Sequence, residues 1–269
     1  MTGQADNRNG FTLIELLLAM AVFLLICAAM FGLLQLSQQR YSSETQLSGA
    51  FQEARLAVDQ ISRDVNDAGF PSAGMFSKLP APPTFYAVSP VAWSPGYPSV
   101  PPSPCLIGTG GGGTCTTPGD FDLILETTLQ TPTGPVVSWI RYQLVGTTLY
   151  RAVVAKTDTD PSGPTTAPGV MVPFLANVMN NATGQFSQIT ASYPAMFPTG
   201  NPVPIFQYMC DTPTGTVACP NAATPYNSPQ NIRDVDITLI VETQQPDAQT
   251  GQLELIELNG RGHRLNPSN

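Results

Sequence analysis

The sequence is short of charged residues, and basic residues are the scarcer kind. Only 11% of its 269 residues are charged, against about 25% in an ordinary globular protein. Acidic residues outnumber basic ones by 19 to 11, and the formal net charge is −8. A nucleic-acid surface needs a basic patch that displaces counterions, so this composition argues against a nucleic-acid partner.

Histidine is almost absent. The one histidine, His263, lies in a polar C-terminal stretch, so a Ser-His-Asp or Cys-His site has only one possible base, and nothing marks its partners. The glycine run 110–113 is not followed by the Lys-Ser or Lys-Thr of a phosphate loop. Two aspartate pairs lack the glycine and terminal glutamate of a calcium loop: Asp120 with Asp122, and Asp158 with Asp160. We expect no enzyme activity, no cofactor and no metal.

Cysteine is also scarce, with five in the chain. Cys27 lies in an apolar stretch, and the other four allow three disulfide pairings. Both local pairs enclose loops rich in Gly, Pro and Thr, which favours Cys105 with Cys115 and Cys210 with Cys219. Zinc would need tighter spacing and more histidine. Disulfides persist only in an oxidising compartment, so the pairs indicate an extracytoplasmic domain.

One long apolar run is present near the N-terminus. Residues 16–34 are 19 consecutive residues without a charge. At 1.5 Å per residue they form a helix of about 28 Å, close to the thickness of the hydrocarbon core of a bilayer. A secretory signal peptide would have a shorter apolar core ending at small residues. Ala19-Met20-Ala21 has that form, but further apolar residues follow it. The run therefore predicts a membrane-spanning helix.

One acid, Glu15, lies at the N-terminal end of this helix. An ionisable residue in a membrane helix is costly and points to a function; the alternative is a hydrated carboxylate at headgroup depth. If the chain were cut after Gly10, Phe11 would carry a new amino group four residues before Glu15. Between two staggered copies, that amine would neutralise the acid of the next chain and set the register of an assembly.

Residues 10–15, Gly-Phe-Thr-Leu-Ile-Glu, resemble the prepilin cleavage and methylation motif of type IV pilins and type II secretion pseudopilins. The resemblance implies that a prepilin peptidase cuts between Gly10 and Phe11 and methylates the new amine of Phe11. It also implies that Glu15 is the acid used in subunit addition. The leader departs from the pattern in its charge, because Asp6 offsets Arg8.

Apolar residues continue at helical spacing beyond the membrane stretch. They form one seam: Leu47, Phe51, Ala54, Val58, Ile61, Val65 and Ala68. Gly69 followed by Pro71 predicts the end of the helix. We expect one helix from Phe11 to Ala68, about 85 Å long. The seam could serve a coiled coil, but we favour a helix whose outer half lies against a sheet of its own domain, as in pilins.

Strand-like segments begin at Phe121. Residues 136–144 and 149–154 predict a hairpin around the turn Gly146-Thr147. The other expected strands are 121–126, 170–178, 235–241 with its partner 252–258, and the weaker candidates 186–193 and 205–209. We expect residues 157–168 to form a loop and the tail Gly260–Asn269 to be exposed. The fold class is therefore α+β, which the resemblance identifies with the type IV pilin fold.

The resemblance divides the chain into four parts: leader 1–10, membrane and assembly helix 11–36, extracytoplasmic half of the helix 37–70, and β-rich periplasmic domain 71–269. It implies a single-pass protein of the bacterial inner membrane, in contact with membrane lipid. Its implied partners are a prepilin peptidase, other minor pilins and the major pilin (or other pseudopilins), and an inner-membrane assembly platform.

Two regions favour a subtype within this family. Both regions resemble W-type minor pilins and J-type pseudopilins. One is the segment 39–71, which contains Arg63-Asp64-Val65, and the other is the hairpin with Ile140-Arg141-Tyr142 and Leu149-Tyr150-Arg151. The resemblance implies a minor subunit that helps to initiate or cap a type IV pilus, with a place at or near the pilus tip. The alternatives are a J-type pseudopilin of a type II secretion system and a membrane-anchored adhesin or binding module.

Overall fold

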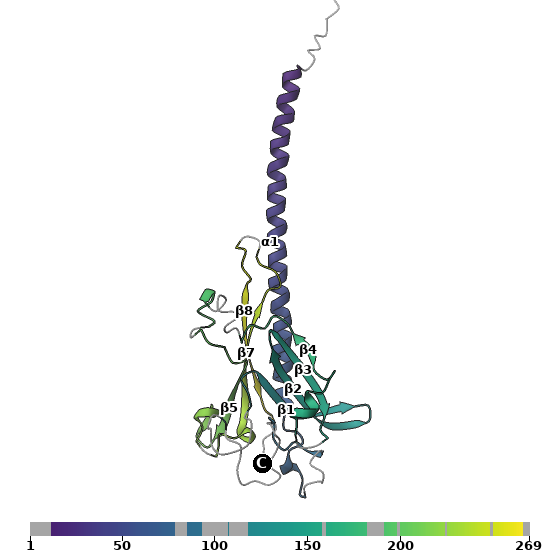
Figure 1. Cartoon of the computed structure of the whole chain (residues 1–269), viewed down its shortest axis with the longest axis vertical. Helices are drawn as coiled ribbons and strands as arrows, with labels where there is room; N and C mark the ends of the chain where they lie inside the picture. The colour runs from purple at the N-terminus through teal and green to yellow at the C-terminus, as the bar shows by residue number, and fades with distance from the viewer. Residues whose placement is uncertain are drawn as a thin grey trace, which may run out of the picture.

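The computed structural model describes residues 12–78, 85–92, 107, 118–157, 160–181, 191–197, 200–223, 225–247 and 250–265. A long helix stands out of a β-rich domain, as Figure 1 shows. The predicted cleavage residues Gly10 and Phe11 and the predicted disulfide partners Cys105 and Cys115 lie outside the described ranges.

Helix α1 spans Leu13–Asp67, 55 residues, which makes it about 82 Å long. Thr12 is its N-cap and Ala68, in an extended conformation, is its C-cap. Gly69 follows with φ of +86°, a conformation that favours glycine. The helix ends one residue before the predicted end, and the predicted start at Phe11 lies outside the described residues.

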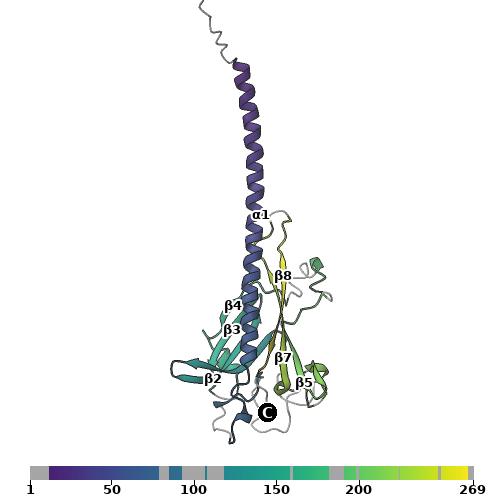
Figure 2. The ribbon, with the colours of Figure 1, turned by 180° about the vertical axis from the view of Figure 1, so that it is seen from behind.

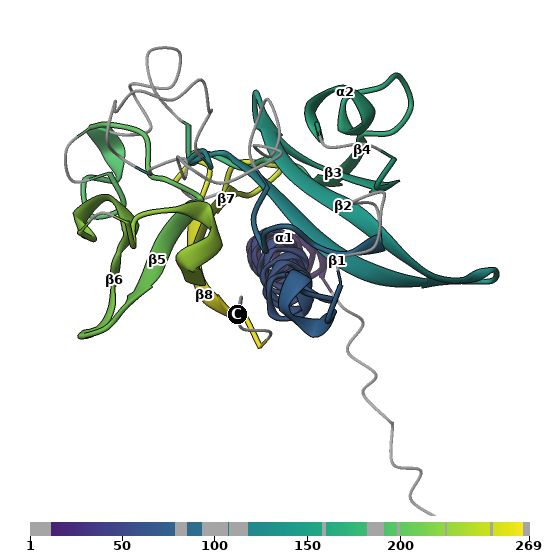
Figure 3. The same ribbon diagram turned by 90° about the horizontal axis from the view of Figure 1, so that it is seen from below.

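The β-domain has two four-stranded antiparallel sheets, where the sequence led us to expect one. Seen from below in Figure 3, α1 lies between them. Figure 2 shows the same arrangement from behind, with the lower part of α1 lying between the two sheets. One apolar core joins the two sheets and the helix, which contributes Ala54, Ile61 and Val65 from the predicted seam.

The first sheet has the order β1-β2-β3-β4. Its strands are β1 Asp122–Thr131, β2 Gly134–Val145, β3 Thr148–Ala155 and β4 Val172–Leu175. The predicted hairpin is confirmed, because Val145 pairs with Thr148 around a two-residue turn in which Gly146 has φ of +62°. The connection 157–168, expected as a loop, contains the single helical turn α2 Ser162–Thr165.

The second sheet has the order β6-β5-β7-β8. Its strands are β5 Phe206–Thr212, β6 Gly215–Ala218, β7 Ile232–Glu242 and β8 Leu255–His263. The pairing of β7 with β8 is confirmed, whereas β6 was not predicted. For the weak candidate 186–193, residues 191–192 are helical, and 186–190 lie outside the described residues.

The expected exposed tail is wrong for residues 260–263, which form the second half of β8. Gly260 and Gly262 face α1, as the two-residue period of a strand requires. A Cβ atom on Gly260 would lie 2.2 Å from Val58 Cγ1, and one on Gly262 would lie 2.4 Å from Val65 Cβ. Only glycine at these two positions lets the strand approach the helix so closely.

A buried ion pair fixes residues 85–92 to the first sheet. Lys156 Nζ lies 2.5 Å from Glu126 Oε1, and both side chains are fully buried. Glu126 Oε2 accepts the backbone N–H of Val88 at 2.8 Å, and Lys156 donates to the carbonyl of Tyr86 at 3.1 Å. A buried charge is tolerated only when it is paired and hydrogen-bonded. Backbone groups of residues 86–89 supply these hydrogen bonds, so the buried pair is stable only while this segment packs against the sheet.

We expect Gly260→Ala to lower the free energy of unfolding by about 1–3 kcal/mol, the usual effect of overpacking. The reason is the contact with Val58 Cγ1. Thermal or denaturant unfolding of the full chain in detergent measures the loss. Val58→Ala removes that methyl group and leaves the nearest Val58 atom, Cβ, at 3.7 Å. Gly260→Ala should therefore cost much less in a Val58→Ala background than in the wild type.

The matched control is Gly49→Ala, because Gly49 lies in α1 and a methyl group added there would have nothing within 4 Å. It should leave stability unchanged or raise it by up to ~1 kcal/mol, the difference in helix propensity. Equal costs of Gly260→Ala in the two backgrounds would contradict the proposed clash.

Candidate functional site

The N-terminal half of α1 has no contact with the β-domain. From Leu13 to Ser42 every residue is exposed except Cys27, which is half-buried. By length and composition, α1 is the one helix among the described residues that could cross a membrane. In Figure 1 this half projects away from both sheets. Exposed apolar surface on this scale needs a cover, such as lipid or other helices.

Glu15 and Thr12 form a reciprocal cap at the start of this helix. The backbone N–H and the hydroxyl of Thr12 both donate to Glu15 Oε2 at 2.9 Å, and the N–H of Glu15 donates to the Thr12 hydroxyl at 3.4 Å. This is a capping box, which satisfies donors that the first helical turn would otherwise leave open. The carboxylate is thereby held over the N-terminal end of the helix, where negative charge is also favoured by the helix dipole.

Comparison with known proteins identifies this end of the chain. Residues 6–31 match the family described as the prokaryotic N-terminal methylation motif. The chain is type IV pilin-like. The match contains the Thr12–Glu15 cap and the first half of the apolar helix, and it ends far before the β-domain. No curated protein and no solved structure matches the chain.

The prepilin motif implies processing by a prepilin peptidase and assembly into a pilus or pseudopilus. Proteins of the type IV pilin family are structural subunits and not enzymes. The fold agrees with this assignment, because a long N-terminal helix, apolar in its first half, is followed by an antiparallel β-domain.

A polar cluster attaches the other half of α1 to the first sheet. Asp64 Oδ2 accepts the hydroxyl of Tyr142 at 2.5 Å and Arg151 Nη2 at 2.9 Å. Arg151 Nε also donates to the Tyr142 hydroxyl oxygen at 2.9 Å, and Gln60 donates to Asp64 Oδ1 at 2.9 Å. Asp64 lies in α1, Tyr142 in β2 and Arg151 in β3. The fold therefore brings the end of the helix into direct contact with the central hairpin.

Electrostatics keep the phenol of Tyr142 protonated in this cluster. Burial, and after it the Asp64 carboxylate, raise the pKa of Tyr142 well above that of a free phenol. Tyr142 therefore remains a hydrogen-bond donor to Asp64 throughout the physiological pH range. The cluster has the features of a structural attachment, since its hydrogen bonds join Asp64 of α1 to Tyr142 of β2 and Arg151 of β3.

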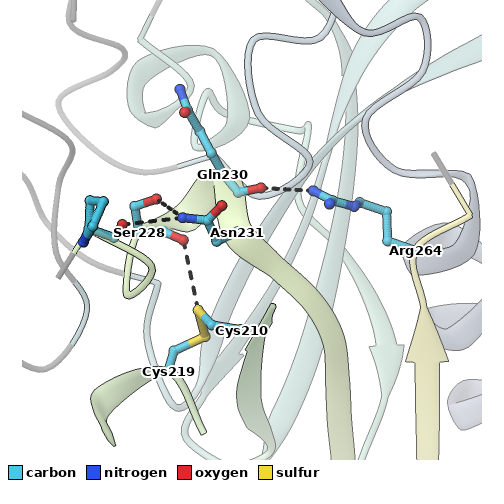
Figure 4. Close-up of a disulfide and its surroundings, with 7 residues drawn as sticks. Cys210, Cys219, Ser228, Gln230, Asn231 and Arg264 are labelled. Atoms are coloured by element: carbon cyan, nitrogen blue, oxygen red, sulfur yellow. Dashed lines mark hydrogen bonds between the residues drawn. A yellow bond between two sulfur atoms is a disulfide. The ribbon is translucent and has the colours of Figure 1, made fainter. Parts of the chain in front are cut away.

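Of the four cysteines outside the membrane stretch, two are joined within the described residues. Cys210 of β5 and Cys219 form a disulfide, as the sequence favoured, and both side chains are fully buried. Figure 4 shows its surroundings: Asn231 donates to the Ser228 hydroxyl at 2.9 Å, and Arg264 donates to the carbonyl of Gln230 at 2.9 Å. The bond joins β5 to the residue directly after β6 and so links the two strands of this hairpin.

Among the described residues, no group of three or more His, Cys, Asp and Glu side chains is placed to hold a metal ion. His263, the single candidate base, lies at the end of β8, with its Nδ1 2.5 Å from Asp234 Oδ1. The backbone N–H of His263 donates to Asn66 of α1 at 2.8 Å. Its contacts join strand and helix.

We expect Asp64→Asn to lower the free energy of unfolding by about 1–3 kcal/mol, because it leaves Arg151 half-buried without its anionic partner. Unfolding of the full chain by urea measures the change. Arg151→Met in the Asp64→Asn background should recover part of the loss, since it removes the unpaired charge. A second mutation that added its own full cost would show that the two side chains do not act as a pair.

Proposed function

We propose that this chain is a minor subunit that helps to initiate or cap a type IV pilus. The observation that carries the proposal is the Thr12–Glu15 cap, within the matched methylation motif, at the start of a helix whose first half is apolar and exposed. A plain membrane anchor needs neither an acid at the position of Glu15 nor the cleavage motif that begins at Gly10. A subunit that adds to a filament through its helix uses the acid and the cleavage motif.

In this proposal a prepilin peptidase cuts between Gly10 and Phe11, removes residues 1–10 and methylates the amine of Phe11. Residues 11–36 hold the chain in the inner membrane until assembly, and Glu15 pairs with the Phe11 amine of a neighbouring subunit. The domain 71–269 lies in the periplasm, which the Cys210–Cys219 disulfide supports. The second pair, Cys105 with Cys115, remains a proposal.

The size of the β-domain supports a minor role. Two sheets, a stapled hairpin and long connections suit a scarce subunit at or near the tip, where a growing lattice does not confine them. The partners would be other minor pilins, the major pilin and the assembly platform. A J-type pseudopilin of a type II secretion system is the second candidate, because the segments joined through Asp64, Tyr142 and Arg151 resemble both subtypes.

Replacement of Gly10 by glutamate should block removal of the leader, because a bulky charged side chain replaces the small residue at the cleavage point. Intact-mass spectrometry of the full chain measures it: the wild type should lose residues 1–10 and gain one methyl group, and the variant should keep the leader. Gly3→Glu, the same change within the leader, is the control and should be processed normally. Normal processing of the Gly10 variant would contradict the cleavage site.

Deletion of this chain should abolish or strongly reduce pili and leave protein secretion intact. Pili are counted on the cells, and the secreted proteins are assayed in the medium of the same culture. Glu15→Leu and Glu15→Gln should insert in the membrane but fail to restore pili. The glutamine variant keeps an acceptor for the Thr12 N–H and loses only the charge, so it separates capping from charge pairing. Lost secretion with intact pili would favour the J-type pseudopilin, and no change in either would favour an adhesin.

A further inference from the structure

An open groove of about 760 Å³ runs beside α1 on the side of β8. Its apolar lining comes from Leu47 and Phe51 of the helix and from Leu255 and Ile256 of the strand, with Tyr193 from a neighbouring segment. The sequence seam predicted Phe51 to be covered by the sheet. In the structure 43% of its surface is exposed.

The groove has a physical cause in the sequence of β8. The strand face that meets α1 carries Gly260 and Gly262 at its far end, where the helix comes close. By the two-residue period of a strand, the same face carries Leu258 and Ile256 toward the membrane end. At this end of the strand Ile256 lines the groove together with the seam residues Leu47 and Phe51, which border open space.

Three carboxylates line the groove: Glu44, Glu254 and Glu257. No lysine or arginine among the described residues forms an ion pair with any of them. Glu257 accepts the side-chain amide of Asn259 at 3.0 Å, a neutral donor that leaves its charge uncompensated. Burial, and after it the negative charges of Glu254 and Glu242, raise the pKa of Tyr193. Tyr193 therefore lies in the same negative potential. An apolar floor with these acids beside it is complementary to an apolar segment flanked by cations.

The position of the groove argues against lipid as its occupant. Glu44 lies eight residues beyond Leu36, the last residue of the proposed membrane segment 11–36, which is about 12 Å along the helix. The groove therefore stands clear of the hydrocarbon core when residues 11–36 span the membrane. Its three carboxylates would also repel the headgroups of anionic lipids.

A second copy of this chain is a poor electrostatic match. Between residues 37 and 67 its helix exposes four acids and three arginines, and the whole chain has a net charge of −8. The same sign would face the groove. Charge complementarity therefore favours a different protein as the partner.

We propose that the groove binds a basic amphipathic helix of another protein. Residues 44–51 of α1 extend over about 10 Å, the length of two helical turns. Apolar side chains at positions i, i+3 or i+4 and i+7 of the partner would rest on Leu47, Phe51 and Ile256. Lysine or arginine side chains beside that apolar face would reach Glu44, Glu254 and Glu257. The proposal does not depend on the filament being a pilus or a pseudopilus.

The test uses the full chain in nanodiscs of phosphatidylcholine, which carries no net charge. The probe is a helical 15-residue peptide with leucines on one face, lysines beside them and one benzophenone among the leucines. Photo-crosslinks mapped by mass spectrometry should fall in residues 44–51 and 253–257. The cross-linking yield should drop about three- to tenfold in Glu254→Gln/Glu257→Gln, in line with exposed ion pairs, and also in 1 M salt. Phe51→Ala should lower it similarly.

The matched control is Leu56→Ala, which truncates another exposed leucine of α1 that lines a separate, smaller depression beside β4. It should leave the yield unchanged. A peptide with glutamine in place of lysine should cross-link several-fold less. Equal yields for the two peptides, or cross-links confined to residues 13–36, would overturn the proposal. Displacement of the peptide by unlabelled Glu254→Gln/Glu257→Gln chain, whose own groove should bind the peptide weakly, would also overturn it, in favour of a second copy.

Discussion

The close approach of α1 to β8 is the contact on which the rest of the domain depends. Gly260 and Gly262 leave space for Val58 and Val65, and the helix can then lie between two sheets instead of on one. Small residues at a helix–strand contact gain dispersion energy along the backbone that larger side chains would lose. Once the helix is in place, Asp64 reaches Tyr142 and Arg151 of the other sheet.

Much of the fold could be predicted from local sequence. The period of the seam predicted the helix nearly to its last residue, and the strand-like segments on either side of Gly146-Thr147 predicted the central hairpin and its turn. The division into two sheets could not be predicted, because it depends on which strands share a face with the helix. Gly260 and Gly262 carry the signal in their spacing, but glycines beside Arg261 and His263 are also typical of an exposed tail.

The candidate site divides in a similar way. Glu15 stands out in sequence because one acid in an apolar helix is costly, and its capping partner Thr12 is three residues away. The buried pair Glu126–Lys156 and the cluster at Asp64 join residues that are far apart in the chain, so no spacing marks them. The exposure of Phe51 could not be predicted from the apolar seam either. Periodicity tells which residues share a helix face, but it does not tell how far along that face the neighbouring strand stays in contact.

The single unbroken helix also determines how the molecule carries mechanical load. A pull on the membrane end of α1 acts along the helix axis, and β8 runs beside that axis, so the force reaches the domain as shear. Shear loads many side-chain contacts at once, among them Val58, Val65 and the Asp64 cluster, whereas peeling would break them one after another. A domain attached in this way is suited to being pulled by the N-terminal half of α1 without being unfolded.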